Sequence, residues 1–229
     1  MKTLKSKNDN TLLILTVTLL TLSSCLTSAK LDKFVAAQYN NELPKLNKKK
    51  KADIEINSSS LKDNPLISMT VHKTDKFLPL LVYWKYDHRQ SCSLNPSIPI
   101  TNFSNAINSM ATKNLSEKLQ GKKLELTVQE APANFSIVAK ENMIWLVYAY
   151  SWSKIYIEPD FKDLVVSYTL LDANTAVKTG TITIKNTDKH KGLRYFQSWK
   201  SATSEYLSAY NSNFTNMTKS FVTQLTQEL

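Results

Sequence analysis

Residues 143 to 157 have the sequence MIWLVYAYSWSKIYI, a long apolar and aromatic stretch with one charged residue, Lys154. Alternate side chains of a strand point to opposite faces of a sheet, and here both faces are apolar. One face carries Ile144, Leu146, Tyr148, Tyr150 and Trp152, and the other carries Met143, Trp145, Val147 and Ala149. A strand with two apolar faces is typical of the middle of a sheet, so this stretch predicts one long central strand.

Shorter segments around it alternate apolar and polar residues with the period of two that predicts strands. They span residues 53–57, 66–72, 77–86 and 123–129, followed by a hairpin of 164–172 and 177–186 that turns at Asp172-Ala173-Asn174. Apolar residues spaced by three and four predict helices over 102–119, which Gly121 would end, and over 196–225, with a shorter helix over 31–42. Residues 87–99 and 131–141 have no period, so we expect irregular links there.

The order of strands, helix, strands and long helix predicts an α+β fold. We expect a two-layer sandwich, with a mostly antiparallel sheet and two helices, including a long C-terminal helix. Two helices can cover one face of such a sheet, which leaves the second face of the central strand apolar and exposed. An exposed apolar face is typical of a surface that meets a partner or lipid. We therefore predict a docking surface that includes Trp145 and Val147.

The N-terminus has the three parts of a secretory signal. Lys2, Lys5 and Lys7 precede an uncharged run over 11–22, and small polar residues then lead to Cys25. The run is shorter than the roughly 20 residues that a membrane-spanning helix needs, which favours export over a permanent transmembrane helix. We expect a signal peptide over 1–24, a tether over 25–52 and a single domain over 53–229.

The residues Leu22-Ser23-Ser24-Cys25 resemble the lipobox of bacterial lipoproteins. The resemblance implies cleavage between Ser24 and Cys25, and lipidation of Cys25. Two or three acyl chains would hold the protein on a membrane without any protein segment inside it. An Asp after the cysteine often signals retention at the inner membrane in such lipoproteins. Leu26 and Thr27 follow here, which favours the outer membrane with the domain facing the periplasm.

Composition narrows the possible functions. The chain has three glycines, two cysteines and three histidines, too few for a dinucleotide fingerprint, a phosphate loop or a cysteine zinc cluster. We therefore expect no cofactor and no metal. The formal charge is +10, but an exported protein whose lysines are not interleaved with stacking aromatics is not expected to bind nucleic acid.

The order of elements over about 53–227, behind the lipobox, resembles the auxiliary lipoproteins of ABC-type lipid transport systems and small lipoproteins of the YajG type. The resemblance implies a non-catalytic accessory protein that docks on an envelope partner in transport or assembly. One alternative is a lipid- or glycan-handling enzyme with Cys92 as nucleophile and His88 or His72 as base, at a site over Asp87 to Cys92. Another is a soluble lipid carrier, which requires an enclosed apolar cavity.

Overall fold

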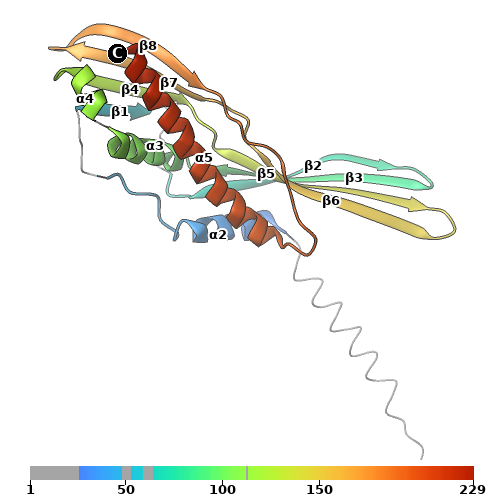
Figure 1. Ribbon diagram of the computed structural model, residues 1–229. Helices are drawn as coiled ribbons and strands as arrows, with labels where there is room; N and C mark the ends of the chain where they lie inside the picture. The colour runs from blue at the N-terminus through green and yellow to red at the C-terminus, as the bar shows by residue number, and fades with distance from the viewer. Residues whose placement is uncertain (1–25, 48–52, 59–63, 112) are drawn as a thin grey trace, which may run out of the picture.

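The computed structural model describes residues 26–47, 53–58, 64–111 and 113–229, and their fold is α+β. Figure 1 shows two sheets joined by a long C-terminal helix. The predicted class is confirmed. The numbers of sheets and helices differ from the expectation. The described residues form two sheets and four helices, whereas the sequence indicated one sheet and two helices.

The first sheet has the strand order β1 (Ile54–Ser58), β4 (Lys123–Glu130), β7 (Leu164–Asp172) and β8 (Thr175–Ile184). Strand β1 is parallel to β4, and the other pairs are antiparallel. The β7–β8 hairpin turns at Ala173 and Asn174, both at positive φ, as predicted. One face packs against α3 (Ser97–Met110), α4 (Lys113–Leu119) and the second half of α5 (Trp199–Glu228), around Phe103, Leu126, Phe214 and Phe221.

The second sheet is antiparallel, in the order β2 (Ser68–Pro79), β3 (Tyr83–Leu94), β5 (Asn134–Trp145), β6 (Ala149–Pro159) and β9 (Lys191–Gly192). Helix α2 (Ser28–Gln38) and the first half of α5 cover only one end of it. A second core forms there, from Leu31, Val35, Cys92, Leu94, Phe135, Ile137, Ile157, Tyr206 and Tyr210 among others.

Helix α2 lies inside the range expected to be a tether, and it packs on the domain. Thr27 caps its N-terminus by accepting a hydrogen bond from the Lys30 backbone N–H. Leu31 and Val35 are fully buried against the second sheet. The packed structure therefore begins directly after the segment 1–25.

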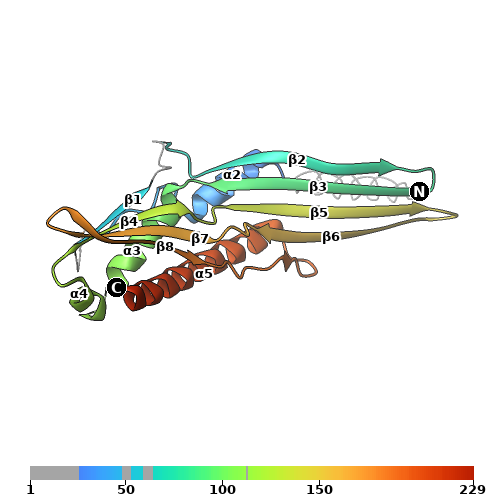
Figure 2. The ribbon, with the colours of Figure 1, turned by 90° about the horizontal axis from the view of Figure 1, so that it is seen from above.

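The far halves of β2, β3, β5 and β6 extend past every helix as a single layer (Figures 1 and 2). The stretch expected to be one central strand, 143–157, forms the tip of this layer. Chain reversal at Leu146 to Tyr148 divides the stretch between β5 and β6. Residues 77–86 divide in the same way between β2 and β3. Both long-strand predictions were wrong, because each apolar run contains a hairpin turn.

Other predicted boundaries also differ from the structure. Residues 83–94 and 134–145 are strands, so neither 87–99 nor 131–141 is an irregular link throughout. The helix predicted over 102–119 is two helices, α3 and α4, and Gly121 follows α4 with φ of 80°. Phe196 lies before α5, fully exposed, and is not part of its buried stripe.

Candidate docking surface at the tip of the second sheet

The free end of the second sheet consists of residues 77–84, from the β2–β3 hairpin, and 142–153, from the β5–β6 hairpin. We call these two segments the projecting end. They contain no Asp, Glu, Lys or Arg. The exposed large apolar side chains among them are Phe77, Leu78, Leu80, Leu81, Val82, Trp84, Trp145, Leu146, Val147, Tyr148, Tyr150 and Trp152. An apolar cluster of this size on a soluble surface marks a site of interaction.

The two residues predicted to form the docking surface both lie in the projecting end. Trp145 ends β5 with half of its surface exposed, and Val147 lies in the turn, 89% exposed. The Trp145 backbone N–H donates to the Val82 carbonyl oxygen, 2.8 Å away, which holds the two hairpins side by side at their tips. The flat sheet face expected around Trp145 and Val147 is therefore replaced by a pair of adjacent hairpin turns.

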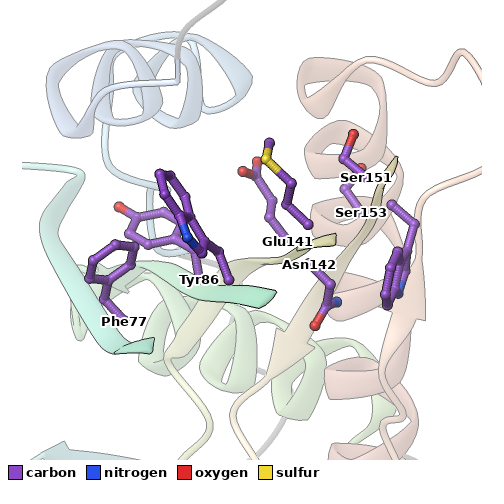
Figure 3. Close-up of a pocket in the computed structure, with 9 residues that line it drawn as sticks. Phe77, Tyr86, Glu141, Asn142, Ser151 and Ser153 are labelled. Atoms are coloured by element: carbon purple, nitrogen blue, oxygen red, sulfur yellow. The ribbon is translucent and has the colours of Figure 1, made fainter. Parts of the chain in front are cut away.

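One face of the projecting end contains a shallow hollow of about 320 Å³, half open to solvent. Figure 3 shows Phe77 and Tyr86 on one side of it, Ser151 and Ser153 on the other, and Glu141 between them. Paired residues of neighbouring strands point to the same face, and the pairings Trp84–Met143–Ser151 and Tyr86–Glu141–Ser153 build the floor. Phe77 meets Trp84 and Tyr86 edge to face at 6.4 and 6.1 Å.

The opposite face is apolar next to the tip and becomes polar one row further back. The pairing Tyr83–Ile144–Tyr150 forms one row across three strands, and Lys85–Asn142–Trp152 forms the next. Tyr83 donates to the Asn142 side-chain oxygen at 2.7 Å, which orders the start of this face. Apolar and aromatic groups therefore surround the projecting end on both faces and at its tip.

A row of charges lies behind the apolar residues, across four strands. Lys76 pairs with Asp87, Asp87 with Lys140, and Lys140 with Lys154. Lys85 lies two residues nearer the tip, with its ammonium 3.9 Å from the Asp87 carboxylate. We call Lys76, Lys85, Lys140 and Lys154 the basic row. It keeps a net positive charge beside two carboxylates, those of Asp87 and of Glu141, which is next to Lys140 on β5.

No protein-family model matches the chain, and no curated protein or solved structure matches it significantly. In the described ranges no helix is long and apolar enough to span a membrane. Ser24 and Cys25, the predicted cleavage and lipidation residues, lie outside the described residues.

The alternative site over Asp87 to Cys92 is divided by the strand that contains it. Because β3 alternates, Asp87, Arg89 and Ser91 lie on one face, whereas His88 and Cys92 lie on the other. Arg89 bonds Glu158 through both guanidinium ends, at 2.8 and 3.2 Å, and also bonds Asp75 at 2.9 Å. These bonds connect β2, β3 and β6, so Arg89 stabilises the sheet.

The two histidines proposed as alternative bases lie side by side on β2 and β3, with their ring centroids 4.4 Å apart. Burial, followed by the neighbouring His72, lowers the pKa of His88. His88 is four strand residues from Cys92, about 13 Å along β3, too far for proton transfer to a thiol. Among the described residues, no three His, Cys, Asp or Glu side chains gather as metal ligands.

Cys92 is fully buried in the second core, and burial raises its pKa to about 11. The thiol is the protonated, unreactive form at neutral pH. We expect Ellman's reagent to label Cys92 roughly a hundredfold more slowly in the native protein than in urea, because both burial and protonation oppose attack. The Cys25→Ala form is used so that Cys92 is the only thiol. Equal labelling rates in the two states would contradict this placement.

Proposed function

We propose that this chain is a lipid-anchored, non-catalytic accessory protein of the bacterial cell envelope. It faces the periplasm from the outer membrane and acts in transport or assembly by docking through the projecting end. The observation that carries the proposal is the concentration of exposed apolar side chains at two adjacent hairpin turns. A partner that covers these exposed apolar side chains removes them from water, which is favourable in free energy.

Two further observations support docking over catalysis. The segment with the most reactive side chains in the sequence, Asp87 to Cys92, has its thiol buried and its guanidinium held in ion pairs. The hollow beside Phe77 is open along one side, unlike the enclosed cavity that a soluble lipid carrier requires. The lipobox resemblance supports attachment of the domain to the membrane through Cys25.

Photo-crosslinking tests the docking proposal. A photoreactive amino acid at Val147 should capture an envelope component in cells, because this side chain points outward at the tip of the β5–β6 hairpin. The same group at Phe196, an equally exposed aromatic position in the loop before α5, is the matched control and should capture nothing specific. Trp145→Glu should weaken capture from Val147 at least tenfold with unchanged far-UV circular dichroism. Identical products from Val147 and Phe196 would refute docking through the projecting end.

A further inference from the structure

We infer that the projecting end docks on the surface of an anionic lipid bilayer, into which its two hairpin turns insert. The inference rests on the proposed function and identifies what the docking surface contacts. Its basis is the order of residue types along the sheet from the tip inward. That order matches the order of chemical environments that a bilayer presents from its hydrocarbon to its headgroups.

Aliphatic residues come first. Leu80, Leu81 and Val82 form one turn, and Leu146 and Val147 lie in the other. All five are at least half exposed, and the Leu81 side chain is fully exposed. These side chains extend beyond the last paired strand residues, so they would be the first to reach the hydrocarbon.

Aromatic residues follow. Tyr148 ends the β5–β6 turn, and the first paired residues behind the turns include Trp145, Tyr83, Tyr150, Trp84 and Trp152. Trp and Tyr are enriched where hydrocarbon meets headgroups, because each ring has an apolar body and a polar edge. The Tyr83 hydroxyl donates a hydrogen bond to Asn142. A polar group near the hydrocarbon needs such a partner, because an unpaired one costs free energy there.

The basic row comes third. Lys85 lies two residues behind Tyr83, and Lys76, Lys140 and Lys154 lie in the row of Asp87, four residues behind it, so the lysines are about 7 to 13 Å behind Tyr83. With the aromatic rings at the hydrocarbon boundary, Lys85 lies among the headgroups, which add roughly 5 to 8 Å on each side of the hydrocarbon, and the other three lysines lie at the outer surface of the headgroups. Each lysine near an anionic surface is worth about a two- to fivefold gain in binding or more.

The distribution around the sheet favours lipid over a protein partner. A protein partner covers one face of a sheet, whereas lipid surrounds an inserted element. Phe77, Trp84 and Met143 lie on one face, and Ile144, Tyr150 and Trp152 lie on the other. The turns between these faces are apolar as well.

The test uses residues 26–229, because the two cores of the described structure consist of residues from Leu26 onward. Vesicles of phosphatidylethanolamine with phosphatidylglycerol should carry this protein upward in a density gradient, and vesicles of phosphatidylcholine alone should carry less. Leu81→Asp with Val147→Asp should weaken binding at least tenfold. The matched control is Ala176→Asp with Val177→Asp, which places the same charges at exposed positions of β8 in the first sheet and should leave binding unchanged.

Two further measurements test the order of layers. A single tryptophan at Trp145 should be quenched more by acyl chains brominated near the carboxyl end than by chains brominated near the methyl end, since the inference places it close to the headgroups. A single tryptophan at Trp199 should be quenched by neither, because Trp199 lies at the start of α5 beside the second core. Lys76→Gln with Lys154→Gln should weaken binding about tenfold to anionic vesicles and little to neutral ones. Far-UV circular dichroism and a cooperative melt verify that each variant is folded.

Three results would overturn insertion into lipid without refuting docking through the projecting end. Absence of flotation, together with capture of an envelope protein from Val147 in cells, would replace lipid by a protein partner. A dimer that Val147→Asp converts to a monomer would make a second copy of the chain the occupant. Equal flotation of the tip variant and its control would show that the hairpin turns do not insert. Only failure of both flotation and crosslinking would remove the proposed function as well.

Discussion

Removal of residues 202–229 should leave a chain without a cooperative melting transition. Those residues form most of α5, whose halves pack on different sheets: Tyr206 and Tyr210 lie in the second core, and Phe214, Met217, Phe221 and Leu225 lie in the first. Burial of one large aliphatic or Phe side chain stabilises a protein by about 1.5 to 3 kcal/mol. The loss of these six buried side chains would therefore remove most or all of the free energy of unfolding, which is roughly 5 to 15 kcal/mol for a folded protein.

Point variants make the same prediction testable when the truncated chain aggregates. Phe214→Ala should lower the free energy of unfolding by about 3 to 5 kcal/mol, since the ring is fully buried between α5 and the first sheet. Ser208→Ala, at an exposed position of the same helix, should change it by less than about 0.5 kcal/mol. Urea unfolding followed by circular dichroism measures both. A truncated chain that melts near the full-length temperature would contradict the role assigned to α5.

The second large effect concerns the anchor. In a bacterial host, Cys25→Ala should leave the precursor uncleaved and without lipid, because the thioether to diacylglycerol requires the cysteine sulfur. Each acyl methylene contributes about 0.8 kcal/mol to membrane affinity, so the loss of acyl chains removes stable attachment by lipid. Mass spectrometry of the purified product and metabolic labelling with palmitate measure processing directly.

Cys92→Ala is the matched control for Cys25→Ala, since the chain has only these two cysteines. The control removes a buried thiol and leaves the lipobox intact, so lipidation and cleavage should proceed normally. Detection of a correctly anchored, cleaved Cys25→Ala protein would contradict the lipoprotein proposal.

Hairpins with polar turns could be predicted from the sequence, whereas hairpins with apolar turns could not. The β7–β8 hairpin was found because Asp172 and Asn174 are turn formers, and Asn174 indeed adopts φ of 70°. The β2–β3 and β5–β6 turns consist of Leu80, Leu81 and Val82, and of Leu146, Val147 and Tyr148. Those residues are not turn formers, so alternation continued through the turn and indicated a single strand. Pro79, directly before the β2–β3 turn, was the one signal that could have marked the end of β2. Apolar residues at a turn conflict with the usual polar turn chemistry, and such conflicts are expected at functional sites.

Strand β3 was missed for a different reason. Its buried face in the second core includes Gln90, whose amide donates to the Leu26 carbonyl oxygen at 3.0 Å and whose side-chain oxygen accepts from Ser28. Because a polar residue fills a core position, the apolar period disappears over 87–94. The α+β class depends on the order of elements along the whole chain and agrees with the structure. Trp145 and Val147 are exposed, but at a hairpin turn and not on the face of a central strand as expected.

The short distance in sequence between Cys25 and the helix α2 has a mechanical consequence. Only Leu26 and Thr27 separate the proposed anchor from Ser28, and the Leu26 carbonyl is bonded to Gln90, seven residues and about 23 Å from Tyr83 along β3. A protein held by one lipidated residue on a long tether swivels freely. With lipid at Cys25 and the turns in the bilayer, this domain would be held at two separated points, so the tilt of the second sheet against the membrane would be fixed. The first sheet, which lies at the opposite end of the molecule from the turns, would then always project away from the bilayer.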